Sequence, residues 1–133
     1  MTADARTEHG LIVVPSKYSV GQAIGRLQSI VKSKGFQFFA LIDHAAEAAK
    51  SGLEMCPTQV LIFGNARAGT PVMQAVPAIA IELPLRVLAW EDADKRVWVA
   101  YEDPQIIKER YGVPEGLMQN LSGIGALVER ALT

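Results

Sequence analysis

Two alternating apolar runs flank a polar turn in LRVLAWEDADKRVWVAYE, residues 85–102. Runs rich in β-branched and aromatic residues on both sides of such a turn predict a β-hairpin. We therefore expect strands over 85–91 and 96–102, joined by the turn DADK at 92–95. A hairpin pairs its strands antiparallel, so the sheet contains at least one antiparallel pair.

Three shorter apolar runs precede the hairpin, and each is followed by a helical segment. Ser19 and Gln22 have the spacing of a capping box, which marks the start of the first helix. The hairpin is followed by Asp103-Pro104, a strong helix start, and by a last apolar stripe. We expect strands over 10–15, 36–42 and 58–63. We expect helices over 20–34, 45–51, 104–112 and 116–132, and a further helix of about two turns that ends near Pro77.

The element order β-α-β-α-β-α-β-β-α-α predicts an α+β fold. Helices that cover one side of a sheet are the simplest two-layer solution, so we expect a mixed five-stranded sheet with its helices mainly on one face. The polar first residues, MTADARTEHG, lack an apolar core segment. We expect a disordered N-terminal segment over 1–9 and a single α+β domain over 10–133.

Composition limits the classes of partner. The formal net charge is −1, which argues against nucleic acid because phosphate binding needs clustered lysine and arginine. The start of the chain is neither a signal peptide nor a membrane-spanning helix, so no membrane association is expected. Cys56 is the single cysteine, which fits a reducing, cytoplasmic location, and we expect it to pack as a small hydrophobe.

The turn after the third expected strand is the first candidate site. It reads FGNARAGTPVMQAVP, residues 63–77, and combines two glycines with residues that cap helices. Main-chain amides at a helix start favour anions, so an anion or phosphate pocket is one interpretation. The lysine and hydroxyl of the P-loop motif are missing, and helix capping by Asn65 and Thr70 is the alternative. The ligand-binding candidates are Gly64, Asn65, Arg67, Gly69 and Thr70.

Asp43 and His44 form the second candidate site, at the end of the strand over 36–42. Histidine titrates near neutral pH and suits general acid–base chemistry. In an enzyme, His44 is the candidate catalytic residue, with Asn65 or Thr70 holding the substrate. The alternative is that Asp43 or His44 caps the helix over 45–51. Their spacing to Cys56 matches no metal motif, so no metal is predicted.

Both faces of the hairpin carry bulky side chains. Trp90, Trp98 and Tyr101 are expected either to form an exposed dimer surface or to lie beneath the last helix. Arg86 stands among apolar strand residues and therefore needs a carboxylate partner. The candidates for that partner are Glu82, Glu91, Glu102 and Asp103.

Four segments also carry a resemblance to a known family. They are IDHAAEA at 42–48, PTQVLIFGNARAGTPVMQ at 57–74, LPLRVLAWED at 83–92 and VWVAYEDP at 97–104. With these segments the chain resembles the family of domains of unknown function numbered three hundred and two. The resemblance implies a small α+β domain, often dimeric, and implies no activity or cofactor.

The sequence thus favours a small cytosolic homodimer that binds a small molecule at the turn over 63–72, with an anionic ligand as one option. An enzyme that uses His44 is the alternative.

Overall fold

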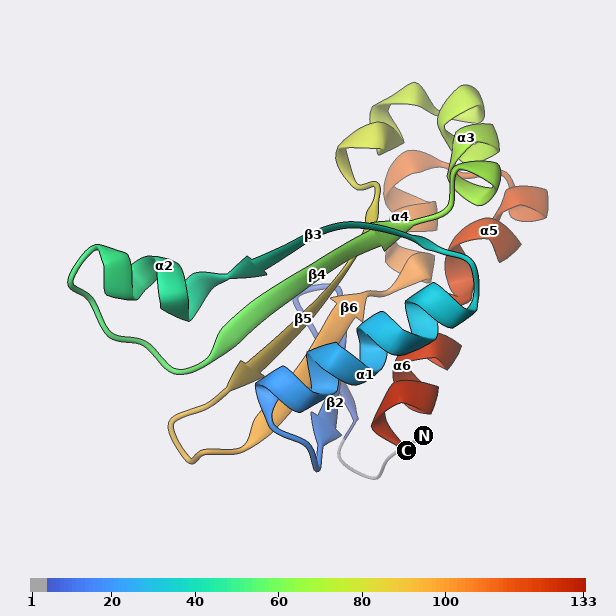
Figure 1. Ribbon diagram of the computed structural model, residues 1–133. Coiled ribbons are helices and arrows are strands. Elements are labelled where there is room, and N and C mark those ends of the chain that lie inside the picture. Colours follow the sequence, from blue (N-terminus) through green and yellow to red (C-terminus); the bar gives the residue numbers. More distant parts are fainter. Residues whose placement is uncertain (1–4) are drawn as a thin grey trace.

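The computed structural model describes residues 5–133 and contains one six-stranded sheet. Its order is β1-β2-β6-β5-β4-β3, and every neighbouring pair is antiparallel (Figure 1). The strands are β1 (Arg6–Glu8), β2 (Leu11–Ser16), β3 (Gln37–Asp43), β4 (Thr58–Gly64), β5 (Leu85–Glu91) and β6 (Val97–Glu102). The helices are α1 (Val20–Ser33), α2 (His44–Lys50), α3 (Ala66–Ala75), α4 (Pro104–Tyr111), α5 (Gln119–Ser122) and α6 (Ile124–Leu132), with 3-10 turns η1 (Pro77–Ile81) and η2 (Glu115–Leu117).

The α+β class is confirmed, but the expected mixed five-stranded sheet is wrong. The sixth strand, β1, lies within the segment 1–9 that was expected to be disordered, of which residues 1–4 fall outside the described part. A turn at His9 and Gly10, both at positive φ, folds β1 back onto β2. The guanidinium of Arg6 then stacks over Trp98, with Cζ 4.2 Å from the ring centroid, and this contact helps to keep the polar strand on the sheet.

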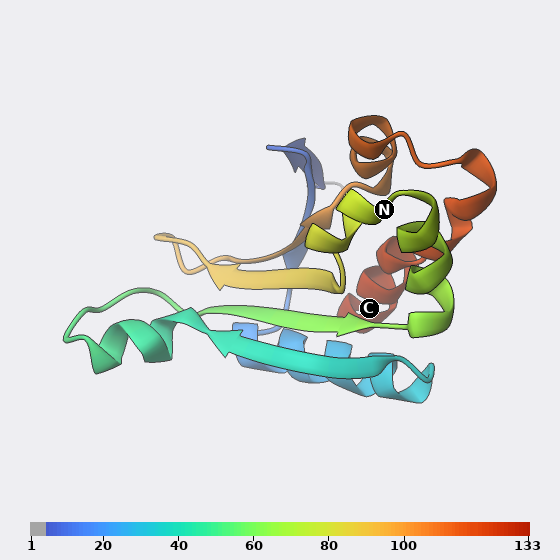
Figure 2. The ribbon, with the colours of Figure 1, turned by 90° about the horizontal axis from the view of Figure 1, so that it is seen from above.

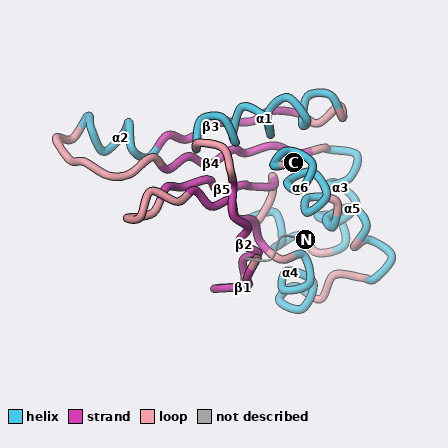
Figure 3. Tube along the Cα trace, turned by 90° about the horizontal axis from the view of Figure 1, so that it is seen from below, coloured by secondary structure: helices cyan, strands magenta, loops and turns pink. Residues whose placement is uncertain are grey.

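No parallel pair forms because the helix after β3 does not cross the sheet. Instead, α2 sits beyond the end of β3, and β4 returns directly alongside it (Figure 1). The pairing sets Gln37 opposite Gly64 and Asp43 opposite Gln59, with an irregularity between Phe38 and Ala40. Strong twist turns β2 steeply across the direction of β3, β4 and β5 when the sheet is seen from below (Figure 3).

The main core forms where α1 and α6 pack on one face of the sheet (Figures 1 and 2). The predicted capping box starts α1: the Gln22 amide donates to Ser19 Oγ, and the Ser19 amide donates to Gln22 Oε1, both at 3.1 Å. The expected continuous helix over 116–132 is instead divided into η2, α5 and α6, with α6 beginning after Gly123. The core holds Val20, Ile24, Leu27 and Val31 of α1, Leu61 and Phe63 of β4, Val87 and Val99 of β5 and β6, and Leu127 and Val128 of α6.

The hairpin aromatics are covered rather than exposed. Tyr101 is 8% exposed and belongs to the core that α1 and α6 share, so the interpretation that the last helix covers the hairpin is correct for this residue. Trp98 is 6% exposed, and its Nε1 donates to Asp92 at 2.8 Å. The alternative of an exposed dimer surface is therefore wrong for Trp98 and Tyr101, while Trp90 is half-buried.

Two features lie at opposite ends of the sheet. Helices α3, α4 and α5 gather at one end, while α2 and the loop to β4 project from the other (Figure 1). Cys56 lies in that loop and is exposed, so the expectation that it packs as a hydrophobe is wrong. Within residues 5–133, the helices are too short or too polar to cross a bilayer.

Replacing Ser19 with alanine is expected to lower the free energy of unfolding by about 1 kcal/mol, because the start of α1 loses a side-chain acceptor. Urea denaturation measures this change. The S29A variant, on the exposed side of α1, is the matched control and is expected to change stability by less than about 0.5 kcal/mol. Equal losses in both variants would show that the cap contributes nothing specific.

Candidate functional site

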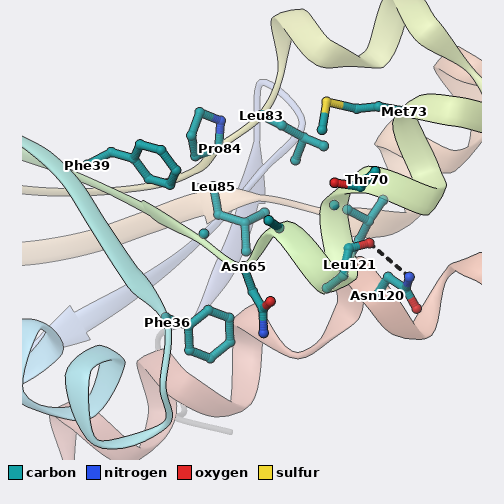
Figure 4. A pocket seen from close by; sticks show the side chains of 14 residues that line it. Phe36, Phe39, Asn65, Thr70, Met73, Leu83, Pro84, Leu85, Asn120 and Leu121 are labelled. Atoms are coloured by element: carbon teal, nitrogen blue, oxygen red, sulfur yellow. Dashed lines mark hydrogen bonds between the residues drawn. The ribbon is translucent and has the colours of Figure 1, made fainter.

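A cavity of about 280 Å³ lies between the start of α3, the first residues of β3 and the segment that enters β5 (Figure 4). Most of its wall is apolar. No charged side chain of the described residues belongs to the lining. The large apolar groups are Phe36, Phe39, Met73, Leu83, Pro84 and Leu121.

The turn that begins α3 uses most of its own main-chain amides. Asn65 caps the helix, with its Oδ1 accepting from the Arg67 amide at 2.9 Å. The Asn65 carbonyl accepts from the amides of Ala68 and Gly69, at 3.0 and 2.8 Å. These donors are therefore engaged inside the helix and do not form an open cradle for phosphate.

Three neutral polar side chains reach the cavity. Asn120 of α5 donates its Nδ2 to the Ala68 carbonyl at 2.8 Å, which fixes the side chain and leaves its Oδ1 as an acceptor (Figure 4). Asn65 has used its oxygen as the cap, so its Nδ2 remains as a donor. Within residues 5–133, Thr70 makes no side-chain hydrogen bond, and its hydroxyl can donate or accept.

The structure brings together four of the predicted ligand-binding residues. Gly64, Asn65, Gly69 and Thr70 all line the cavity. Arg67 is exposed and is not part of the lining. These four predicted residues therefore line a hollow, which lacks the positive charge that was expected to accompany it.

Asp43 and His44 lie far from this cavity in the same chain. The antiparallel register puts Asp43 opposite Gln59 and Gln37 opposite Gly64, so the two candidate sites stand at opposite ends of the β3–β4 pair, about 20 Å apart. Asp43 caps α2 by accepting from the Ala46 amide at 2.9 Å, as the alternative interpretation predicted. His44 is exposed at the first position of α2, so one chain does not assemble the catalytic site in which His44 acts on a substrate held at the turn.

Metal binding finds no support in the described residues either, because no group of three or more histidine, cysteine, aspartate or glutamate side chains lies close enough to share an ion.

Several cavity residues were not identified from the sequence. Phe36 and Phe39 were assigned only to a central strand. In the structure β3 is an edge strand, and Phe36, directly before it, and Phe39, within it, both line the cavity. Asn120 comes from a segment more than 50 residues from Asn65, and no motif connects the two. Asn120 is one of three uncharged polar residues beside the apolar stripe of 117–132, with Gln119 and Ser122, and the sequence does not distinguish it from the other two.

Behind one wall of the cavity lies a cluster of charged groups. Leu85 and Leu121 separate the cluster from the cavity, since each of them borders the cavity on one side and the cluster on the other. Glu82, which is 12% exposed, accepts from the Tyr111 hydroxyl at 2.6 Å. It also pairs with Arg86 at 3.0 Å and with Arg110 at 3.1 Å, which confirms the expectation that Arg86 needs a carboxylate.

A second carboxylate, Glu102, lies 3.6 Å from Arg86 and 3.8 Å from Arg110. The two carboxylates differ in their pKa. The Tyr111 hydroxyl is the main cause of the lowered pKa of Glu82. Burial, followed by the charge of Glu82, raises the pKa of Glu102. The cluster joins η1 and β5 to β6 and α4, and so holds the segment that carries Leu83 and Pro84 to the cavity.

The E82Q variant is expected to lower the free energy of unfolding at pH 7 by about 1.5–3 kcal/mol, because charge-assisted hydrogen bonds are lost. The folded pKa of Glu82 is lowered, so its contribution is present above the unfolded pKa and declines as pH falls through the acid range. Urea denaturation between pH 3 and pH 7 should therefore show a shallower acid-side loss in E82Q than in the native chain.

The E102Q variant is the matched control for E82Q. The folded pKa of Glu102 is raised, so its protonated form favours folding below the unfolded pKa, and this advantage is lost as pH rises through the folded pKa. Burial and the charge of Glu82 disfavour the charged form of Glu102, so E102Q is expected to cost less stability at pH 7 than E82Q. A larger loss in E102Q would contradict this assignment of the two carboxylates.

Comparison with known proteins adds a family and a fold. A family model described as "Domain of unknown function DUF302" matches residues 12–131. A crystal structure of an uncharacterized conserved DUF302 protein from Bacillus stearothermophilus superposes with a TM-score of 0.76, and the match covers 94% of this chain and 97% of that one. Identity to that protein is 15%, so this likeness concerns the fold alone.

Similar curated proteins carry the name of a channel. The chain is 40% identical over 106 residues to "Fluoride-specific ion channel FluC 1" of Brucella suis biovar 1 (strain 1330), covering 80% of this chain and 42% of the relative. It is equally similar to "Fluoride-specific ion channel FluC 2" of Brucella melitensis biotype 1, covering 39% of that protein. The chain thus spans about two fifths of the length of these relatives.

Proposed function

The chain belongs to the DUF302 family of domains of unknown function, and we propose that it binds a small, largely apolar and uncharged molecule in the cavity at the start of α3. The composition of the cavity wall carries this proposal. Small-molecule sites are concave and mostly apolar, with a few fixed polar groups that orient the ligand. Phe36, Phe39 and Leu83 supply the apolar wall, and Asn65 and Asn120 supply the polar groups.

The volume favours a small ligand. Pockets for drug-sized molecules range over about 300–1,000 Å³, and an engineered apolar cavity of about 150 Å³ binds benzene. A cavity of about 280 Å³ falls between the two. A single aromatic ring with one short substituent, or an aliphatic molecule of similar size, matches this space.

The polar groups favour a ligand with one end that both donates and accepts hydrogen bonds. The Asn65 Nδ2 is available to donate, the Asn120 Oδ1 to accept, and the Thr70 hydroxyl to do either. Carboxamides, alcohols and ureas offer this combination without a charge. An anion, which the sequence favoured as one option, finds no cation in the lining, and the amides of residues 67–69 are already engaged.

The homodimeric state and the cytoplasmic location that the sequence favours are part of this proposal. The name "Fluoride-specific ion channel" belongs to the whole Brucella relatives, of which this chain spans about two fifths, and the proposal does not include a channel function.

Titration of ¹⁵N-labelled protein with benzamide and with inorganic phosphate tests the ligand class. Benzamide is expected to shift the amide signals of Gly64, Gly69 and Asn120, and phosphate is expected to leave them unchanged up to the same concentration. Shifts with phosphate alone would overturn the uncharged ligand class. If neither benzamide nor alcohols of similar size shift these signals, the cavity is not a binding site for such molecules.

A larger side chain at Gly69 should fill part of the cavity and weaken ligand binding. A Cβ added at Gly69 would lie 3.8 Å from both Leu83 and Met73, so a longer side chain there extends into the space for the ligand. The G69M variant is expected to weaken benzamide binding at least tenfold. The matched control is G25M, at a glycine of α1 where an added Cβ meets nothing within 4 Å.

Both substitutions replace a helical glycine, so both are expected to gain up to about 1 kcal/mol of helix propensity. Benzamide binding should therefore fall in G69M and stay unchanged in G25M. Equal affinity in the two variants would place the ligand elsewhere.

A further inference from the structure

The exposed apolar side chains of this protein are concentrated in one region. Among the described residues, seven large hydrophobic side chains are exposed, and six of them lie between positions 38 and 55. Four belong to β3, where they are 37–52% exposed. The six are Phe38, Phe39, Leu41, Ile42, Leu53 and Met55.

β3 is an edge strand of the sheet, and β4 pairs with only one of its sides. Its sequence from 38 to 42 is FFALI, with no proline and no charged residue. Edge strands of soluble proteins normally carry such residues, because an apolar edge with free main-chain groups accepts another strand. The length and composition of β3 therefore indicate that the strand is covered when the protein functions.

The segment that follows β3 is also mostly exposed in its own chain. Helix α2 contains no buried residue. It projects beyond the sheet together with the loop that carries Leu53 and Met55 (Figures 1 and 2). We call residues 43–57 the arm.

We propose that β3 pairs antiparallel with β3 of a second copy, about a twofold axis near Ala40, so that the arm of each copy lies against the cavity of the other. The occupant is a second copy because the exposed stretch 38–42 is apolar throughout, and an antiparallel pair about a twofold axis sets this stretch against itself. The pairing sets apolar residues against apolar residues, and no like charges meet along residues 38–42.

The area needed for a stable pair explains the role of the arm. Such interfaces bury about 800 Å² on each partner. An aromatic side chain buries about 150–250 Å², so the half-exposed Phe38 and Phe39 together supply only a part of that area. Leu53, which is 65% exposed, and Met55 extend the apolar surface along the arm. The strand and the arm must both be covered to reach the required area.

In this pair, the two candidate sites that lie far apart within one chain, Asp43-His44 and the cavity, come together across the interface. The end of β3 in one copy lies beside the beginning of β3 in the other. His44 of one copy thus comes next to Phe36 of the other, and Phe36 lines the cavity. The interface rests on the exposed side chains of β3 and of the arm, and only the statement about the cavity rests on the proposed function.

Light scattering coupled to gel filtration tests the pairing. The native chain is expected to have twice the 14.4 kDa mass of one copy. The F38K and I42K variants place a lysine on the strand and are expected to be monomers, while S29K, on the exposed side of α1, is expected to remain dimeric. Circular dichroism confirms that each variant is folded. A monomeric native chain, or folded F38K and I42K variants that remain dimers, would refute pairing through β3.

A mixed sample tests the position of the arm. A nitroxide is attached to position 44 of unlabelled H44C/C56S chains, which are mixed with ¹⁵N-labelled C56S chains. Only contacts between copies affect the observed signals. The Gly64, Asn65 and Gly69 amides are expected to lose intensity, which returns when the nitroxide is reduced with ascorbate. Full intensity at these amides in a dimeric sample would refute the arm position, whether or not benzamide binds.

Discussion

The register between β3 and β4 constrains everything else in this molecule. Because Gln37 stands opposite Gly64, the first residues of β3 meet the turn that begins α3, and Phe36 and Phe39 become walls of the cavity. The same register carries Asp43 and His44 to the far end of the strand pair. A shift of one residue would turn Phe39 to the other face of the sheet and away from the cavity. The cavity and the projecting arm are thus two results of one pairing.

Local signals in the sequence were sufficient for the elements whose hydrogen bonds are local. The capping box of Ser19 and Gln22, the hairpin turn at 92–95 and the cap at Asp103 each involve residues within four positions of one another. The sheet order depends on contacts between residues far apart in the sequence, and no local pattern distinguishes a helix that crosses a sheet from one at its end. That distinction made the mixed sheet wrong. β1 was missed because its polar residues are stabilised by stacking on Trp98 and not by their own hydrophobicity.

The candidate site likewise combines features set by neighbouring residues with features set by residues far away in the sequence. Gly64, Asn65, Gly69 and Thr70 were found because glycines and helix caps mark a turn. The apolar character of the cavity was not predictable, since it depends on residues that reach the turn from elsewhere in the chain, such as Phe36. The Asn65 carbonyl also changes the chemistry, because it occupies the amides that an anion would need. A sequence motif predicts where the helix starts, but it does not show whether the main-chain amides there are already hydrogen-bonded.

The far edge of the sheet has a consequence for assembly. That edge is β1, which has only three residues, Arg6, Thr7 and Glu8, two of them charged. A short charged strand offers little to an incoming strand, whereas β3 at the other edge is long and apolar. In the proposed pair, both apolar edges are joined at the centre, and the outer boundaries of the combined twelve-stranded sheet are the two charged strands. Growth by further strand addition therefore stops at two chains, so that the pair is closed and does not extend into a fibre.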